Sequence, residues 1–101
     1  MSDLSGKQRR WLRGEAHLLK AVVQLGARGL TDSVVAEVDT ALEAHELIKV
    51  RLVGGRDERE AMAADLADRV EAQAVGLTGR VAILFRPHDD PDRRRIRPPG
   101  G

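Results

Sequence analysis

Short apolar runs alternate with longer amphipathic segments along this chain, and this alternation constrains its fold more than any other feature. Each run is too short for a helix and has the length of a buried strand. The clearest runs comprise residues 21–25, 47–52 and 81–85. In the second run apolar and basic residues alternate from Ile48 onwards, which predicts a half-buried strand with one basic face formed by Lys49 and Arg51. Since 101 residues build one domain with a single modest core, these strands belong to one sheet.

Three segments between and around these runs carry apolar residues at helical spacing. The first covers residues 5–20. The second opens at residues 30–32, where Thr31 is the expected N-cap and Asp32 suits the first turn, and it runs to residue 46. The third follows Asp57 and Glu60, a pair that resembles a capping box, and continues to Ala74.

A fourth short strand is expected over residues 75–77, forming a hairpin with residues 81–85 around Thr78 and Gly79. The element order is therefore α-β-α-β-α-β-β. This order predicts an α/β fold, a single compact domain with about four strands in one sheet and three helices packed on it.

The net charge of +1 conceals basic and acidic segments that alternate along the chain. Residues 1–30 carry +4, whereas residues 31–46 carry −5. On a helical wheel of residues 5–20, one side is apolar, with Trp11, Leu12, Ala16, Leu18 and Leu19. The other side is basic and holds no acid, with Lys7, Arg9, Arg10, Arg13, His17 and Lys20. An exposed helix face usually mixes both signs, so this face favours an anionic partner, with an ordinary polar face as the alternative.

The sequence Gly26-Ala27-Arg28-Gly29 lies between the first predicted strand and the second helix. Glycines permit positive φ and close backbone approach, and a helix N-terminus offers unpaired N–H groups with a favourable dipole. This context predicts a phosphate-binding loop in which Arg28 supplies a charge-assisted contact. The alternative is a tight turn that happens to hold a charge. The bare G-x-x-G pattern has little specificity, because a second copy at residues 76–79 falls in the predicted hairpin.

Composition argues against several classes of function. Without cysteine there is no disulfide and no thiol nucleophile. The three histidines stand apart, and no P-loop, dinucleotide fingerprint or metal-ligand spacing occurs, so we expect no enzyme, metal or cofactor. One Trp and one Phe are too few for a base-stacking platform. No apolar run approaches the roughly 20 residues of a membrane span, and no secretory signal is recognisable, which predicts a cytoplasmic protein.

The last part of the sequence differs from the rest. Residues 88–101 contain three prolines, four arginines and one large apolar residue, which predicts a flexible basic tail after a domain of residues 1–87. The arginines at residues 93–97 would add attraction for phosphates, although a dispensable end is an equally good interpretation.

Three blocks of the sequence closely resemble the YhbY-like CRM domain, the chloroplast RNA splicing and ribosome maturation family. The blocks are GKQRRWLR, LGARGLTDSVVAEVDTALEAHELIKV and VAILFRP, and the resemblance runs from about residue 4 to residue 87. It implies a fold like the C-terminal domain of bacterial translation initiation factor three, with an added N-terminal helix. It also implies RNA binding through the GxxG loop and a basic surface. Stand-alone bacterial members of the family associate with precursor large ribosomal subunits, whereas plant relatives with repeated domains act in group II intron splicing.

Two features depart from the pattern of the family, and a third, Gly14, is unfavourable for the helix in which it lies. Glu15 stands where an apolar residue is more common, and Gly76 and Thr78 loosen a strand that is usually richer in β-branched residues. Gly14 interrupts the first helix at a cost of about 1 kcal/mol in helix propensity, and nothing in the sequence explains it.

Residues and resemblance together predict a monomeric, non-catalytic RNA-binding protein that binds ribosomal RNA precursors and assists assembly of the large ribosomal subunit. The candidate RNA-binding residues are Gly26, Ala27, Arg28, Gly29, Lys7, Arg10, Arg13 and Lys20. Lys49 and Arg51 are weaker candidates, because a covering helix would hide them. Two alternatives stay open: a protein-interaction module whose basic helix docks on an acidic partner, and a KH domain, in which the GxxG loop joins two helices.

Overall fold

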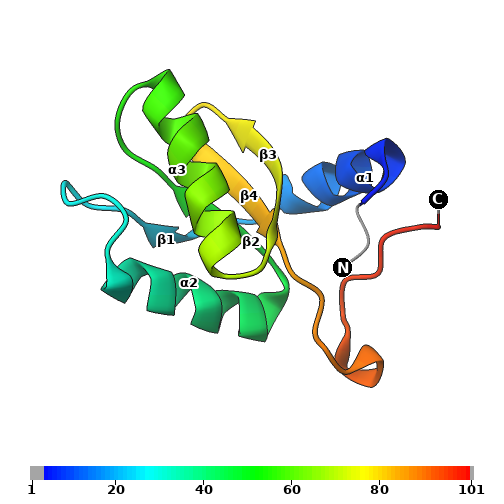
Figure 1. The fold of residues 1–101 in the computed structure, drawn as a ribbon. Helices are drawn as coiled ribbons and strands as arrows, with labels where there is room; N and C mark the ends of the chain where they lie inside the picture. Colours follow the sequence, from blue (N-terminus) through cyan, green and yellow to red (C-terminus); the bar gives the residue numbers. More distant parts are fainter. Residues whose placement is uncertain (1–3, 101) are drawn as a thin grey trace.

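The structure, a computed structural model, describes residues 4–100 and contains four strands and three α-helices in the predicted order (Figure 1). The elements are α1 (Gly6–Ala16), β1 (Ala21–Gln24), α2 (Asp32–His45), β2 (Leu47–Arg51), α3 (Arg56–Arg69), β3 (Gln73–Thr78), β4 (Val81–Phe85) and a 3-10 turn η1 (Pro91–Arg93). The strands form one mixed sheet in the order β1-β2-β4-β3. Strand β1 runs parallel to β2, and the other pairs are antiparallel. The predicted fold class is confirmed.

The helices cover the two faces of the sheet unequally. Helices α2 and α3 pack on one face, where Ile48 and Val50 of β2 point into the larger core. Helix α1 packs on the opposite face, where Leu47 of β2 joins a smaller cluster. That cluster consists of Leu12, Ala16, Leu47, Val75, Ile83 and Phe85, with Leu4, Trp11 and Ile96 packed against it. The alternation along β2 therefore separates two apolar layers, as its period of two requires.

Helix α1 is shorter than its apolar pattern predicted. Ser5 caps it, because its hydroxyl accepts from the Gln8 N–H at 3.1 Å while the Gln8 side chain accepts from the Ser5 N–H at 2.9 Å. The helix ends at Ala16 rather than residue 20, since the chain turns there to enter β1. The assignment of Leu18 and Leu19 to the apolar side was wrong: these side chains are 85% and 40% exposed.

Helix α3 also differs from the prediction at both ends. Its N-cap is Gly55, whose N–H donates to the Glu58 carboxylate at 3.2 Å, so the proposed capping pair of Asp57 and Glu60 was wrong. The helix ends at Arg69, and Ala74 belongs to β3 instead. The chain reverses at Glu71, which has a φ of +53°, and the next N–H, that of Ala72, bonds to the Ala67 carbonyl at 2.9 Å. At a helix C-terminus with this geometry, the residue with positive φ is usually glycine.

We expect Glu71→Gly to stabilise the protein by about 1 kcal/mol, because glycine adopts positive φ without the steric penalty that an L side chain carries. Thermal unfolding followed by circular dichroism should show a higher Tm than the wild type. Glu71→Ala is the matched control, since it removes the same carboxylate but retains the penalty. A glycine variant no more stable than the alanine variant would contradict this interpretation.

The predicted hairpin between β3 and β4 is confirmed, with Thr78 paired to Val81 and Gly79 at a φ of +58° in the turn. Strand β3 is longer than expected and is irregular between Ala74 and Gly76. A Cβ at Gly76 would lie 2.9 Å from Cδ of Arg13, whose side chain crosses the strand there. Glycine at this position therefore makes room for Arg13, which explains its departure from the family pattern.

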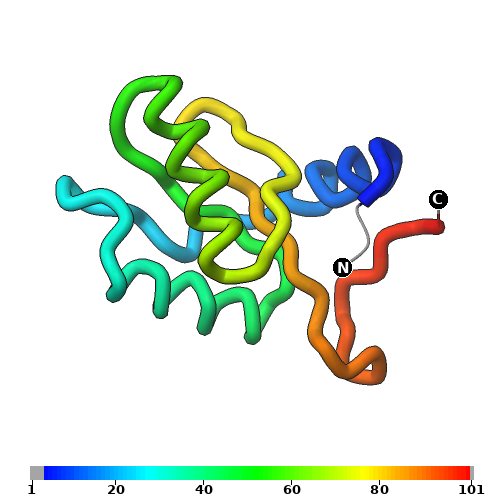
Figure 2. Tube along the Cα trace, viewed as in Figure 1, coloured from blue at the N-terminus to red at the C-terminus, as the bar shows by residue number. Residues whose placement is uncertain are grey.

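The segment after β4 turns back along the molecule towards α1 (Figure 2). Glu46, at the end of α2, is buried, and its carboxylate accepts backbone N–H groups of His88, Arg95 and Ile96 at 2.6, 2.6 and 3.0 Å. Farther along, the Gln8 side chain donates to the Pro99 carbonyl at 2.9 Å. These contacts give the position of the segment; its predicted flexibility and the domain boundary at residue 87 stay predictions.

Candidate nucleic-acid interface

The GxxG loop continues the sheet at the end of β1 and then leaves it. The N–H of Leu25 still donates to the Arg51 carbonyl at 2.9 Å, whereas the Gly29 N–H donates to the Gly26 carbonyl at 2.9 Å and closes a four-residue turn. Gly29 has a φ of +70°, so the backbone selects glycine there. A Cβ at Gly26 would meet no atom within 4 Å. Gly26 therefore leaves open space beside the turn.

The loop offers a smaller set of amides than the sequence predicted. Gly29 uses its N–H within the turn, which removes it from the donors expected to face a phosphate. Gly26, Ala27 and Arg28 are exposed, and their N–H groups have no partner within residues 4–100. The Arg28 side chain likewise forms no hydrogen bond or ion pair with the described part of the chain. A short exposed turn thus carries three N–H groups and one guanidinium that have no partner in the described part of the chain.

The N-terminus of α2 contributes less to this site. Thr31 caps the helix as predicted, accepting from the Val34 N–H at 3.2 Å. Asp32 places a carboxylate in the first turn, where it already interacts favourably with the helix dipole. Because this charge repels a phosphate, the loop amides and Arg28 are the more favourable candidates for binding an anion.

The predicted basic residues of the first helix divide into two groups. Arg9 donates to the Ala74 carbonyl at 3.1 Å, and Arg13 donates to the Val75 carbonyl at 3.0 Å, so both satisfy carbonyls of the edge strand β3. Lys7 and Arg10 are exposed on α1 without a partner in the described region. Lys20 is exposed too, but it lies in the connection to β1 and not on the helix.

The sheet itself adds two cations that sequence reasoning had ranked lower. Lys49 and Arg51 face the side of α1, but the helix covers only part of this face and Arg51 is exposed. Lys49 donates to the Leu19 carbonyl at 3.0 Å and is half-buried. The alternation of residues in this strand had predicted the basic face. How much of it α1 covers could not be predicted, because the position of the helix depends on tertiary packing.

The loop and α1 lie at opposite ends of the molecule, so they do not form one compact cluster (Figures 1 and 2). Between them, Lys20 lies in a shallow hollow together with Lys49 and Arg51. In the parallel pairing of β1 with β2, Ala21 lies opposite Lys49 and Gln24 lies opposite Arg51. These cations therefore connect α1 to the loop along the open face of the sheet.

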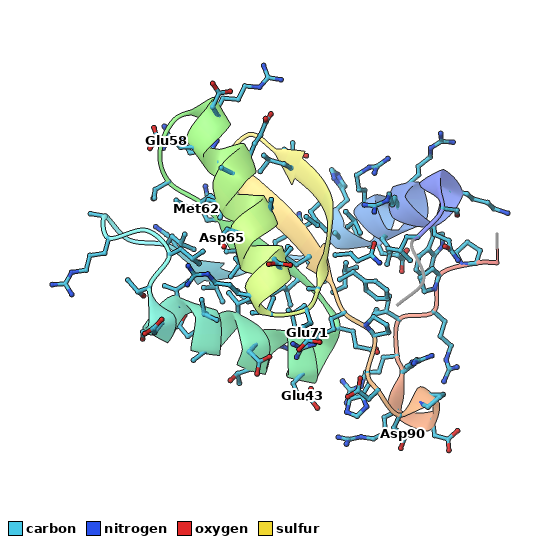
Figure 3. All side chains as sticks on the ribbon, in the orientation of Figure 1. Glu43, Glu58, Met62, Asp65, Glu71 and Asp90 are labelled. Atoms are coloured by element: carbon cyan, nitrogen blue, oxygen red, sulfur yellow. The ribbon has the colours of Figure 1, made fainter. Side chains whose placement is uncertain are left out.

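Charge is distributed unequally between the two sides of the sheet. Helix α1 has four Lys or Arg against one Glu, whereas α2 has four acids and no Lys or Arg. Helix α3 has five acids against three Arg. Figure 3 labels Glu43, Glu58, Asp65 and Glu71 on this acidic side. The field of the protein therefore attracts anions to the α1 side and repels them from the other.

His88 lies among charged side chains near the end of α2. His88 places Nε2 at 3.0 Å from a Glu43 oxygen, while its Nδ1 accepts from the Asp90 N–H at 3.1 Å. Arg86 pairs with Asp39 at 2.7 Å beside it. Within residues 4–100, no three His, Asp or Glu side chains approach closely enough to hold a metal ion. In the same region, no helix is long and apolar enough to cross a bilayer.

Comparisons with known proteins agree with the observed fold and with the resemblance of the sequence to the CRM domain family. A family model described as the CRS1 / YhbY (CRM) domain matches residues 4–86. A Haemophilus influenzae protein named RNA-binding protein is 40% identical over 91 residues, covering 89% of this chain and 92% of the relative. The Bacillus subtilis protein named Probable RNA-binding protein YqeI is 36% identical over 84 residues, covering 82% and 88%.

A solved structure supports the same conclusion about the fold. The solution structure of a hypothetical Staphylococcus aureus protein, described as a candidate RNA binding protein, superposes with a TM-score of 0.81. It is 27% identical to this chain, and the match covers 94% of this chain and all of the other. The loop also follows a strand, β1, rather than a helix, so the arrangement is not that of a KH domain.

Proposed function

The chain belongs to the CRS1 / YhbY (CRM) domain family, and from this premise we propose that it is a non-catalytic protein that binds RNA. The observation that carries the proposal is the exposed turn at Gly26–Gly29, where three amides and the guanidinium of Arg28 have no partner within residues 4–100. A phosphate group is the anion that such a set of backbone donors suits.

The mode of binding follows from what the surface provides. Backbone phosphates are held at the loop, and the cations of the open sheet face and of α1 extend the contact area. Phe85 is buried and Trp11 packs in the smaller core, so exposed aromatic rings do not contribute a stacking platform. Recognition therefore depends on phosphate geometry and on the shape of the RNA.

We expect this binding to weaken steeply as salt concentration rises, because each phosphate contact releases condensed counterions. A filter-binding titration at several salt concentrations should give a log–log slope on the order of −4, corresponding to about five phosphate contacts. A slope near zero would contradict a phosphate-based mode of binding.

We further propose that the target is a ribosomal RNA precursor and that the protein assists assembly of the large ribosomal subunit. The support is the resemblance to stand-alone members of the family. Crosslinking in cells followed by sequencing of the bound RNA should recover precursor ribosomal RNA. Recovery of mature messenger RNA without ribosomal precursors would overturn this assignment.

The acid-free basic side of α1 also suits an acidic protein partner, which is the second candidate function. Affinity purification with and without nuclease separates the two functions. RNA binding predicts that associated proteins are lost after nuclease treatment. Recovery of one protein that resists nuclease would favour the protein-interaction function.

A further inference from the structure

A pocket of about 460 Å³ lies between α1 and the open face of the sheet, and no residue of the GxxG loop lines it. One wall is formed by Arg10 and Arg13 of α1 together with His17, which follows the last residue of the helix. Arg13 uses one guanidinium nitrogen to hold the Val75 carbonyl, which fixes the side chain beside the pocket while other donors stay available. This wall is therefore a preorganised group of donors.

The floor of the pocket is formed by the sheet. Val81 and Ile83 of β4 supply an apolar surface, Thr78 of β3 supplies an exposed hydroxyl, and Lys49 of β2 closes the far side. None of the lining residues is acidic. An apolar floor beneath a cationic rim is complementary to a flat ring joined to an anionic group. A nucleotide has both, because its base is a flat ring and its phosphate is an anion.

Gly14 supplies an independent observation. It lines the pocket, and a Cβ built there would meet no atom within 4 Å, so packing does not require glycine. Its conformation does not require glycine either, because it lies inside the helix, where glycine is less favourable than alanine by about 1 kcal/mol. The sequence thus has an unfavourable residue at a position of α1 that lines the pocket, where a larger side chain would take up part of its volume.

We infer that this pocket binds a single unpaired nucleotide of an RNA strand, with the base on Val81 and Ile83 and the adjoining phosphates on the rim. The inference rests on the proposed function and specifies its ligand. Lys49 and Val81 also line the neighbouring hollow that contains Lys20 and Arg51. A strand leaving the pocket therefore follows these cations toward the GxxG loop.

The test compares two labelled RNA hairpins by fluorescence anisotropy, one with an unpaired bulged nucleotide and one fully paired. The wild type should prefer the bulged hairpin by about tenfold, because the base would remove apolar surface of Val81 and Ile83 from water. Gly14→Leu should bind both hairpins equally, at the affinity of the wild type for the paired one. Its Tm should equal or exceed that of the wild type, because leucine favours the helix.

Gly6→Leu is the matched control, since Gly6 is on the same helix, also has open space around it, and does not line the pocket. It should retain the preference. Thr78→Glu tests the opposite wall and should abolish the preference by placing a negative charge beside the base. If either Gly14→Leu or Thr78→Glu kept the preference, or if the wild type bound both hairpins equally well, the pocket would not be a nucleotide site.

The same assay separates this inference from the proposed function. Tight, salt-sensitive binding of both hairpins without a preference overturns the pocket and leaves RNA binding through the loop intact. Absence of binding to either hairpin overturns both. Binding of a free mononucleotide as tight as that of the bulged hairpin would contradict a site within an RNA strand.

Discussion

Exchange of Arg28 for glutamate is expected to weaken RNA binding on the order of tenfold or more, because it replaces the cation that we propose to contact a phosphate by a repelling charge. The side chain is exposed and has no partner within residues 4–100, so the Tm should stay close to that of the wild type. Filter binding and thermal unfolding of the same preparations measure the two quantities.

The matched control is Arg69→Glu, which changes the net charge by the same amount at the end of α3. Arg69 pairs there with Asp65 at 3.2 Å, among acids that repel RNA. Its exchange should leave RNA affinity nearly unchanged. Equal losses in the two variants would show that net charge alone governs binding, and the role of the loop would have to be abandoned.

Replacing Glu46 by alanine should lower the free energy of unfolding by about 3 kcal/mol. Its carboxylate accepts three backbone N–H groups, from His88, Arg95 and Ile96, and it is only 3% exposed. An unsatisfied buried donor costs about 1 to 3 kcal/mol, and partial release of the segment into water limits the sum. Urea unfolding measures the loss, and hydrogen exchange should become faster at residues 95 and 96.

The backbone of Glu46 allows an internal control. Its φ of +65° penalises any L side chain, so Glu46→Gly removes the carboxylate and the strain together. It should be more stable than Glu46→Ala by about 1 kcal/mol and still less stable than the wild type. If either variant unfolded at the urea concentration of the wild type, Glu46 would not anchor the C-terminal segment.

The contribution of Glu46 also depends on pH in a defined direction. Burial raises the pKa of this carboxyl, but the N–H groups of His88, Arg95 and Ile96, with the charge of His88, lower it by more, and the net pKa lies below its ordinary value of 4.5. Stabilisation is therefore complete above pH 4.5 and is lost as pH falls through the lower folded-state value. The stability difference between the wild type and Glu46→Gln should shrink over this acidic range.

Much of the fold was predictable because its signals are local. The alternation of apolar and basic residues in residues 48–52 corresponds to β2 and its two differently covered faces. Thr31 was correctly identified as the cap of α2 because capping involves residues only three positions apart. The errors fell at helix ends, at Ala16 and Arg69, where the chain leaves the helix to join the sheet and tertiary packing overrides the apolar pattern.

The candidate site was predictable in part for the same reason. The glycine–arginine turn stands out from its neighbours in sequence, and its function stays a proposal. The hydrogen-bond partners of the arginines could not be predicted from the sequence. Arg10 and Arg13 look equivalent in sequence, yet only Arg13 is tied to the edge strand, 62 residues away in the chain. The pocket beside Gly14 is formed by residues from four elements, so no spacing along the chain could reveal it.

The sequence by itself determined the order of the elements, the basic face of β2 and the turn between two glycines. These features depend on periodicity and on conformational preferences that act over a few residues. Tertiary structure alone decided which cations stay free, where α1 ends and what Glu46 binds. Those outcomes depend on contacts between residues far apart in the chain, from 30 positions for Lys49 with Leu19 to 91 for Gln8 with Pro99, and only packing of the whole chain brings such partners together.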